Sequence, residues 1–290
     1  MNVITCNHRN MPLLLRERLH VPQDRITDVL HALKEEDGLP ECVLLCTCNR
    51  FELYFEGCPN AYGERVRRRI ASLAEGAEVP LAAGHLLRGD PAIRHLFRVA
   101  AGLESEIVGE NEILGQIKDA YRLACHAGSN GFFLNACFHR AFRVGKRVRS
   151  ETRLGDGCVG YGAAAVQCAL ADTDGFAGKP ILVVGTGAMG ESLLRSLVRQ
   201  DVGPITVAGH SLENTERLAV KWKIRPDSIK HIATLLHQHD IVFSATASPE
   251  LVIRKDMIAG KKTDAETVWL YDLAMPRNID PEPVSYTHLR

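Results

Sequence analysis

The sequence predicts a two-domain α/β protein, in which an N-terminal α+β domain precedes a doubly wound domain built on a parallel sheet. Three observations support this fold class. The chain has 290 residues, a length that suits two domains. From residue 179 a short apolar run enters a cluster of glycines, and strands then alternate with helical segments. Before about residue 155 the pattern indicates an antiparallel strand pair flanked by helices.

Composition excludes several classes of protein. Apolar residues make up 46% and charged residues 24%, as in globular chains with cores. Basic and acidic residues are balanced at 35 each, so a polyanionic partner must be met by local patches. The N-terminus lacks the pattern of a secretion signal, and no apolar run is long enough for a membrane span. Nine cysteines without such a signal do not suggest a disulfide framework, so we expect a reduced, cytoplasmic protein.

The N-terminal part predicts a βαββα unit followed by a helical stretch. A strand is expected at residues 3–6, a helix at 25–36, strands at 42–46 and 51–55, and a second helix at 61–75. Residues 91–151 are predicted to be helical, with breaks around Gly102, Gly109 and residues 128–131. We expect domains at residues 1–154 and 155–284, with a tail at 285–290.

The C-terminal part carries a dinucleotide-binding pattern. Strands are expected at 181–184, 205–208, 240–245 and 268–274, and the first ends in Gly185, Gly187 and Gly190 at G-x-G-x-x-G spacing before a helix. Such glycines permit a tight turn and close approach to a pyrophosphate. The second strand is followed by Gly209-His210-Ser211 without an acid, which favours NADP over NAD. The candidate cofactor-binding residues are Gly185, Thr186, Gly187, Ala188, Met189, Gly190, His210 and Ser211.

Cys48 is a candidate nucleophile in a short turn between two apolar strands. Arg50 lies two residues further on, where a cation could lower the thiol pKa or hold a substrate carboxylate. The alternative is that Cys48 is a small buried hydrophobe. The spacing of Cys42, Cys46 and Cys48 is not that of a usual zinc site, and we predict no metal.

Polar residues also interrupt an apolar helical pattern over residues 95–116. They are Ser105, Glu110, Glu112 and Gln116, which could line a pocket or lie on a solvated helix face. His95 is either an acid or base near neutrality or a hydrogen-bonded interior residue. A nucleophilic thiol beside a dinucleotide site suggests that an acyl group forms a thioester and is reduced to an aldehyde, or the reverse reaction.

A basic stripe is predicted on the helix that ends near residue 151. Arg140, Arg143 and Arg147 recur at helical spacing, which suits contacts to phosphates. The same spacing is also found on an ordinary solvated helix face.

Together these motifs resemble the glutamyl-tRNA reductase family. The likeness covers about residues 3–284 in order and rests on Thr47-Cys48-Asn49-Arg50 combined with Gly-Leu-x-Ser and Gly-Glu-x-x-Ile-Leu-Gly-Gln in the 95–116 stretch. The other matching segments are Asn7-His8 with Pro12, Arg16-Glu17-Arg18, the glycine turn, residues 240–247 and residues 275–281.

The resemblance implies NADPH-dependent reduction of glutamyl-tRNA to glutamate-1-semialdehyde, the first step of tetrapyrrole (porphyrin) biosynthesis from glutamate. Cys48 would take the glutamyl group as a thioester, and His95 corresponds to a family histidine important for activity. Glutamate-1-semialdehyde aminomutase is a candidate partner for product hand-over, and no membrane is involved. The resemblance places these residues around the glutamyl group: Thr47, Cys48, Asn49, Arg50, Ser105, Glu110, Asn111, Glu112 and Gln116.

The chain departs from the family pattern at three places. Gly209-His210-Ser211 stands where the family usually has Asn-Arg-Thr, and Gly160 and Gly162 stand where it favours serines. Residues 285–290 match nothing in the family, whose members continue into a helical domain that forms homodimers. We therefore expect a chain shortened at its C-terminal end. Two alternatives remain open, namely a shikimate-type NADP dehydrogenase acting on a free small molecule and a non-catalytic tRNA-binding protein.

Overall fold

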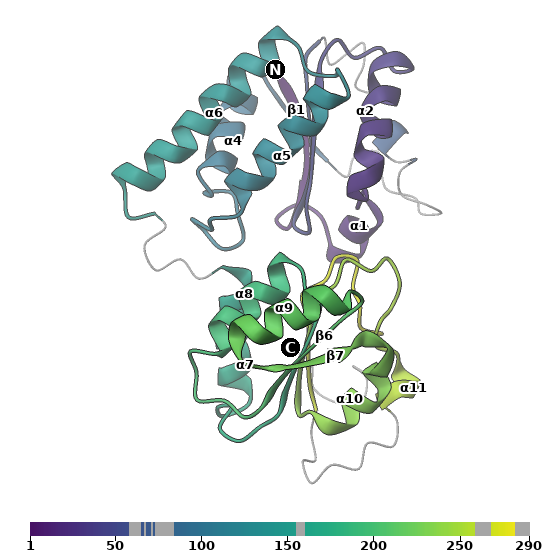
Figure 1. Ribbon diagram of the computed structural model, residues 1–290. Helices are drawn as coiled ribbons and strands as arrows, with labels where there is room; N and C mark the ends of the chain where they lie inside the picture. Colours follow the sequence, from purple (N-terminus) through teal and green to yellow (C-terminus); the bar gives the residue numbers. More distant parts are fainter. Residues whose placement is uncertain are drawn as a thin grey trace. The chain divides into compact units, whose positions relative to one another are not determined.

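The computed structural model describes residues 1–57, 65–66, 68–70, 72, 84–154, 160–258 and 268–281. The chain divides into two compact units, Met1–Cys158 and Val159–Arg290. The first is an α+β unit on an antiparallel sheet, and the second is a doubly wound unit on a parallel sheet (Figure 1). The fold class predicted from the sequence is confirmed.

The first unit is built on a four-stranded sheet with the strand order β2-β3-β1-β4. All neighbouring strands are antiparallel, and their bounds are β1 (Asn2–Asn7), β2 (Cys42–Cys46), β3 (Arg50–Phe55) and β4 (His85–Arg88). Strands β1 and β3 are buried along their whole length because helices cover both faces of the sheet.

The helices of the first unit lie on opposite sides of this sheet. Figure 1 shows α2 (Ile26–Glu35) on one side and α4 (Asp90–Ala100), α5 (Ile113–His126) and α6 (Phe132–Glu151) on the other. A short helix, α1 (Leu13–Arg18), and a 3-10 turn, η1 (Gln23–Arg25), connect β1 to α2. Tyr54 of β3 packs edge-on against Phe138 of α6, with ring centroids 5.4 Å apart, so sheet and helices share one core.

Three details of the first unit differ from the predictions. Strand β4 was not predicted, because a four-residue edge strand has too short a pattern to be distinguished from a loop. The predicted breaks at Gly102 and Gly109 are present, but the residues between them also form no helix, so 101–112 is one loop. Both glycines have positive φ angles, 79° and 84°, and the Gly109 N–H bonds the Gly102 carbonyl at 2.9 Å. The predicted helix at 61–75 lies partly outside the described residues; residues 65–66, 68–70 and 72 are helical.

The second unit contains a five-stranded parallel sheet with the order β7-β6-β5-β8-β9. The strands are β5 (Ile181–Val184), β6 (Ile205–Gly209), β7 (Arg225–Ser228), β8 (Ile241–Ser244) and β9 (Trp269–Asp272). The helices are α7 (Tyr161–Asp172), α8 (Ala188–Leu197), α9 (Leu212–Trp222), η2 (Ile229–His231), α10 (Ile232–Gln238) and α11 (Lys255–Ile258). Strand β7 was not predicted, since its sequence Arg-Pro-Asp-Ser is polar and it forms only an edge.

Strand β5 separates the two hydrophobic cores of the second unit. Its side chains alternate, so that Ile181 and Val183 belong to one core and Leu182 and Val184 to the other. Helix α7, which was also not predicted, packs closely on α8. A Cβ atom on Gly162 of α7 would lie 2.8 Å from the backbone nitrogen of Leu193, so the close contact depends on this glycine.

Two further observations concern the described residues as a whole. None of the helices in this part of the chain is long and apolar enough to cross a membrane. No disulfide joins the cysteines in the same ranges, and no group of three or more His, Cys, Asp or Glu side chains is placed to hold a metal ion there.

The contact between α4 and α6 leads to the first testable expectation. A Cβ atom on Gly145 of α6 would lie 2.5 Å from the carbonyl oxygen of Ala100. Gly145→Ala should therefore lower the free energy of unfolding by about 1–3 kcal/mol through overpacking. Urea unfolding followed by far-UV circular dichroism measures this change.

Gly115→Ala is the matched control, because this exposed helical glycine has no described atom within 4 Å of its Cβ position. It should leave stability unchanged or raise it by up to about 1 kcal/mol. Equal effects of the two substitutions would show that the α4–α6 contact does not limit the size of residue 145.

Candidate active site

Cys48 lies at the tip of the tight turn that joins β2 to β3, as the sequence predicts. The Thr47 N–H bonds the Arg50 carbonyl at 2.8 Å and closes the turn, and the Asn49 N–H bonds the Thr47 hydroxyl at 3.2 Å. The side chain of Cys48 is half-buried. The turn therefore presents one thiol in a fixed position at the end of a rigid hairpin.

Burial raises the pKa of the Cys48 thiol to about 11. The carboxylates of Glu110 and Glu112 contribute to this rise, and the guanidinium of Arg16 opposes it. The thiol is consequently protonated at neutral pH, and its proton must leave as it reacts.

The guanidinium that contacts the turn is that of Arg16, not that of Arg50. From α1, the Arg16 Nη1 donates to the Cys48 carbonyl and to the Asn49 Oδ1, both at 3.3 Å. Arg50 was expected beside the thiol, but its Nη2 donates to the Glu104 carbonyl at 2.7 Å and its Nη1 to Glu52 at 3.2 Å. Cys48 lies in the turn, before β3 begins at Arg50, so the two-residue spacing does not place the two side chains on one strand face.

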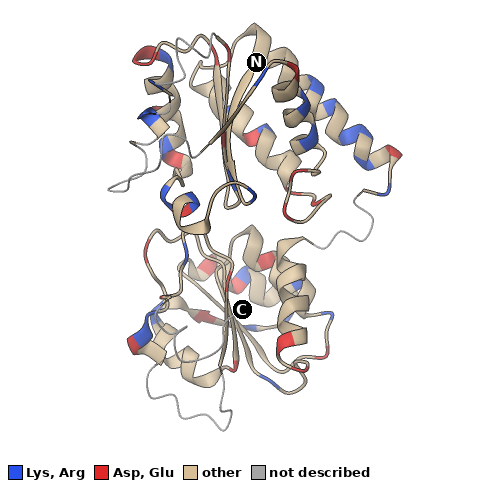
Figure 2. Cartoon of the chain, turned by 180° about the vertical axis from the view of Figure 1, so that it is seen from behind, with Lys and Arg blue, Asp and Glu red and all other residues tan. Residues whose placement is uncertain are grey.

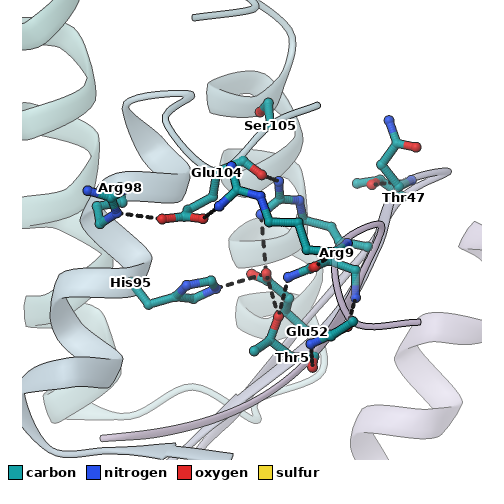
Figure 3. A network of polar contacts seen from close by, with 12 residues as sticks. Thr5, Arg9, Thr47, Glu52, His95, Arg98, Glu104 and Ser105 are labelled. Atoms are coloured by element: carbon teal, nitrogen blue, oxygen red, sulfur yellow. Dashed lines mark hydrogen bonds and ion pairs between the residues drawn. The ribbon is translucent and has the colours of Figure 1, made fainter. Parts of the chain in front are cut away.

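Glu52 is the centre of a polar network that sequence reasoning missed (Figure 3). Its side chain is fully buried in β3 and accepts from the Tyr54 hydroxyl at 2.5 Å, the Thr5 hydroxyl at 3.1 Å and Arg50. Burial alone would raise the pKa of Glu52, but Arg50 and His95 outweigh it and lower the pKa to about 2. A single acid within the run Phe51–Phe55, where all the other side chains are apolar or aromatic, was the available signal, since a buried charge requires partners.

His95 extends this network from helix α4. Its Nε2 lies 2.9 Å from the Glu52 Oε1, and the side chain is buried. Among the described residues, Glu52 is the one polar partner shown for this imidazole. The structure thus supports the interior hydrogen bond rather than direct contact between His95 and the thiol.

A second set of predicted residues is brought together by the loop after α4. Ser105 is buried and donates to Glu110 at 3.2 Å, while the other oxygen of Glu110 accepts from the Glu112 N–H at 3.1 Å. Glu110 is itself buried, so the alternative of a solvated face does not hold for it. Burial and the neighbouring Glu110 raise the pKa of Glu112. Asn111 is exposed and Gln116 half-buried on the same segment.

The loop is fixed from both sides by basic residues. Glu104 pairs with Arg98 of α4 and, at 2.7 Å, with Arg9 (Figure 3). Arg149 of α6 donates to the Glu110 carbonyl at 3.0 Å. The polar loop is therefore held as a defined surface.

In the second unit the glycine turn has the geometry that a dinucleotide requires. Gly185 has a φ of 117°, and a Cβ atom there would lie 2.3 Å from the Ala245 carbonyl oxygen. A Cβ atom on Gly190 would lie 2.1 Å from the Gly185 carbonyl oxygen, so the turn packs tightly on α8. At Gly187, which precedes α8, no described atom lies within 4 Å of the Cβ position. The open face at Gly187 and the first turn of α8 fit a pyrophosphate.

The remaining predicted cofactor residues lie around this turn. Thr186 approaches Gly209, whose Cβ position is 2.6 Å from the Thr186 Cγ2. His210 is exposed, and the hydroxyl of Ser211 caps α9 by accepting from the Asn214 N–H at 3.3 Å. Ala188 and Met189 form the first turn of α8. All of these predicted positions therefore cluster at the carboxyl ends of β5 and β6.

Asn278 anchors a neighbouring segment that sequence reasoning left without a role. Its Oδ1 accepts from the Thr246 hydroxyl at 2.6 Å and the Thr246 N–H at 3.1 Å. The carboxylate of Asp272 accepts from the N–H groups of Asn278 and Ile279 at 2.8 and 2.9 Å. These bonds fix the chain beside Ala245 and thus beside the glycine turn.

Comparison with known proteins identifies relatives for both units. A family model described as "Glutamyl-tRNAGlu reductase, N-terminal domain" matches residues 4–152, and one described as "Shikimate / quinate 5-dehydrogenase" matches residues 167–290. A glutamyl-tRNA reductase of Rubrobacter xylanophilus is 40% identical over 283 residues, covering 95% of this chain and 65% of the relative. One of Syntrophus aciditrophicus is 34% identical over 286 residues, covering 96% and 67%.

A solved structure gives the same result. Glutamyl-tRNA reductase from Methanopyrus kandleri matches with a TM-score of 0.50 and 33% identity, covering 99% of this chain and 69% of that chain. The chain spans about 65% of the length of the curated relatives it matches.

The buried network leads to an expectation about acid stability. Glu52→Gln should lower the free energy of unfolding at pH 7 by about 3–5 kcal/mol, because Arg50 is left buried without its counter-charge. The pKa of Glu52 is lowered in the folded state, so its contribution is complete above its ordinary value of 4.5 and is lost as the pH falls toward 2. The difference between wild type and variant should therefore shrink on acidification.

Urea unfolding at pH 7, 5 and 3, followed by far-UV circular dichroism, measures this difference. The only two tryptophans, Trp222 and Trp269, belong to the second unit, so their fluorescence monitors that unit separately. Glu36→Gln is the control, since the exposed pair of Glu36 with Arg69 is worth at most about 1 kcal/mol. A pH-independent effect of Glu52→Gln would contradict the assignment of a buried charge.

Proposed function

The chain belongs to the glutamyl-tRNA reductase family, and on that basis we propose that it reduces glutamyl-tRNA to glutamate-1-semialdehyde with NADPH. This reaction is the first step of tetrapyrrole synthesis from glutamate. The observation that supports it most directly is the thiol of Cys48, held at the tip of a closed turn and within the electrostatic field of two acids and one guanidinium.

In the proposed first step, the Cys48 sulfur attacks the carbonyl carbon of the aminoacyl ester. The sulfur–carbon bond forms, the ester carbon–oxygen bond breaks, and the thiol proton ends on the released ribose hydroxyl of the tRNA. The turn serves this step by holding the thiol without side-chain motion. The buried network of Arg50, Glu52 and His95 would hold this turn in place, because Arg50 ends the turn and bonds both Glu52 and the Glu104 carbonyl of the loop after α4.

The second unit would hold the cofactor through residues 185–190, with His210 and Ser211 beside the adenosine ribose. A bound reduced nicotinamide supplies the hydride that releases the acyl group as an aldehyde. Because β6 is followed by Gly209-His210-Ser211, no carboxylate at that point repels a 2′-phosphate, which supports the proposed choice of NADPH.

The tRNA would contact the basic residues of α6. Arg140, Arg143 and Lys146 are exposed on this helix, and Figure 2 shows basic side chains along it. Arg147 is exposed as well but pairs with Glu151 at 3.0 Å. A row of exposed cations on one long helix suits the phosphates of a nucleic acid, whereas the whole chain has no net charge. We further propose that the product passes to glutamate-1-semialdehyde aminomutase. The protein would also form a homodimer, as members of the family do.

Transfer of the glutamyl group to Cys48 can be observed directly. Incubation with labelled glutamyl-tRNA in the absence of NADPH should leave label on the peptide that contains Cys48. Cys48→Ser should abolish this label, since serine is a far weaker nucleophile without an activating base. Cys125→Ser is the control, because it removes an exposed thiol of the same unit and should leave the label unchanged.

The outcome separates the proposed function from its alternatives. Oxidation of NADPH with a free small molecule that survives Cys48→Ser would indicate a shikimate-type dehydrogenase. Binding of tRNA without any label on Cys48 would indicate a non-catalytic tRNA-binding protein. Either result would overturn the thioester mechanism.

The role of α6 leads to an expectation about salt dependence. The triple variant Arg140→Gln, Arg143→Gln, Lys146→Gln should raise the KM for glutamyl-tRNA and leave kcat unchanged. The slope of log KM against log salt should fall by about 0.7–0.9 for each phosphate contact removed.

Lys223→Gln combined with Arg225→Gln is the charge control in the second unit and should leave the salt slope unchanged. An unaltered slope in the α6 variant would show that α6 is only a solvated face.

A further inference from the structure

The segment after β9 holds one asparagine that organises the chain leaving β8. Asn278 is fully buried. Its Oδ1 accepts from the Thr246 hydroxyl at 2.6 Å, the Thr246 N–H at 3.1 Å and the Ser244 hydroxyl at 3.4 Å, while its Nδ2 donates to the Ser248 carbonyl at 3.2 Å. Both ends of a single side-chain amide are therefore used to shape residues 244–248.

The main chain of Asn278 is fixed as well as its side chain. Its carbonyl accepts the N–H groups of Val252 and Ile253 at 2.8 and 3.0 Å, and its own N–H donates to the Asp272 carboxylate at 2.8 Å. The chain from β8 to residue 253 is thus tied to one buried residue at several points. The conformation of this loop consequently depends on a residue that lies far from it in the sequence.

The loop lies at the edge of the sheet that carries the glycine turn. Strand β8 pairs with β5 so that Ser244 stands beside Val184, and a Cβ atom on Gly185 would lie 2.3 Å from the Ala245 carbonyl oxygen. Strand β6 lies on the other side of β5. In a doubly wound sheet a dinucleotide lies across the crevice at such a point. With the adenosine ribose beside β6, we expect the nicotinamide half on the β8 side.

This loop offers a cofactor its main chain more than its side chains. The Thr246 hydroxyl is bound to Asn278, and the Ser248 hydroxyl donates to the Glu250 carbonyl at 3.0 Å. Ala247, between them, is exposed and has no polar side chain. The path of the main chain therefore determines what fits there, and Asn278 sets that path.

We propose that Asn278 is a positioning residue for the cofactor, because it holds the main chain of residues 245–248 in the shape that receives the nicotinamide ribose and ring. This inference rests on the proposed function, which assigns a reduced nicotinamide to the second unit. Asn278 is buried and acts through the loop rather than by touching the cofactor. Its loss should weaken the nicotinamide half of the site and leave the adenosine half, at residues 209–211, intact.

The binding of two ligands to the full chain, measured by isothermal titration calorimetry, tests this role. NADPH contains both halves, whereas 2′,5′-ADP contains the adenosine half with its 2′-phosphate. Asn278→Ala should raise the Kd for NADPH about tenfold through the lost hydrogen bonds. The Kd for 2′,5′-ADP should stay within about twofold of wild type, as expected for a distant site. Thr246→Val removes one bond to Asn278 at nearly constant volume, so it should have a smaller effect of the same kind. This variant still decides the question if Asn278→Ala does not fold.

Gln238→Ala is the matched control, because it removes an exposed amide at the opposite end of β8. Both dissociation constants should remain at their wild-type values. An equal rise of both constants in Asn278→Ala would show that Asn278 supports the whole unit. Unchanged NADPH binding would show that the loop does not receive the nicotinamide. Either result overturns the proposal.

These measurements involve neither tRNA nor Cys48. If the wild-type chain forms no thioester, the proposed function fails, while the two dissociation constants still decide the role of Asn278. A wild-type chain that binds neither ligand, or that gains no affinity from the nicotinamide half of NADPH, would overturn that role even if Cys48 accepts the glutamyl group.

Discussion

The first unit depends on one buried carboxylate. Glu52 lies within the sheet where water cannot solvate its charge, and the structure compensates by directing Arg50, His95, Tyr54 and Thr5 toward it. These partners come from two strands and from α4, and Arg50 also reaches the loop after that helix. The cost of an unpaired charge in this environment therefore fixes strands, helix and loop in one arrangement. The Cys48 turn begins beside this network, so its position follows from the same constraint.

The sequence predicted the parts of the fold whose pattern is local. The run from Ile181 to Gly190 predicted a strand, a glycine turn and a helix, because alternation and glycine spacing depend only on neighbouring residues. Strands β4 and β7 were missed because edge strands bury little and carry no clear pattern. The breaks at Gly102 and Gly109 were predicted, but the residues between them were expected to be helical because their apolar spacing is that of a helix.

For the site residues, too, the sequence predicted what depends on neighbouring residues and missed what depends on distant ones. The Cys48 turn was found, since a polar tetrapeptide between apolar strands is a local signal. The partner of Arg50 was not found, and neither was the contact of Arg16 with the turn, because both depend on how strands and helices distant in sequence pack together. Glu52 was overlooked for a different reason. The acid within an apolar run was a signal, but a strand with one solvated face would carry the same residue, and only the fold shows that β3 is buried along its whole length.

The environment of Cys48 affects how readily its thiol is oxidised. Oxidants such as peroxides react with the thiolate, and a thiol whose pKa is raised to about 11 is almost wholly protonated at pH 7. Burial and the two nearby acids thus keep the resting sulfur inert toward damage. In the proposed mechanism, the half-buried sulfur would lose its proton only as it attacks a bound acyl group, so the resting thiol would be little exposed to oxidation.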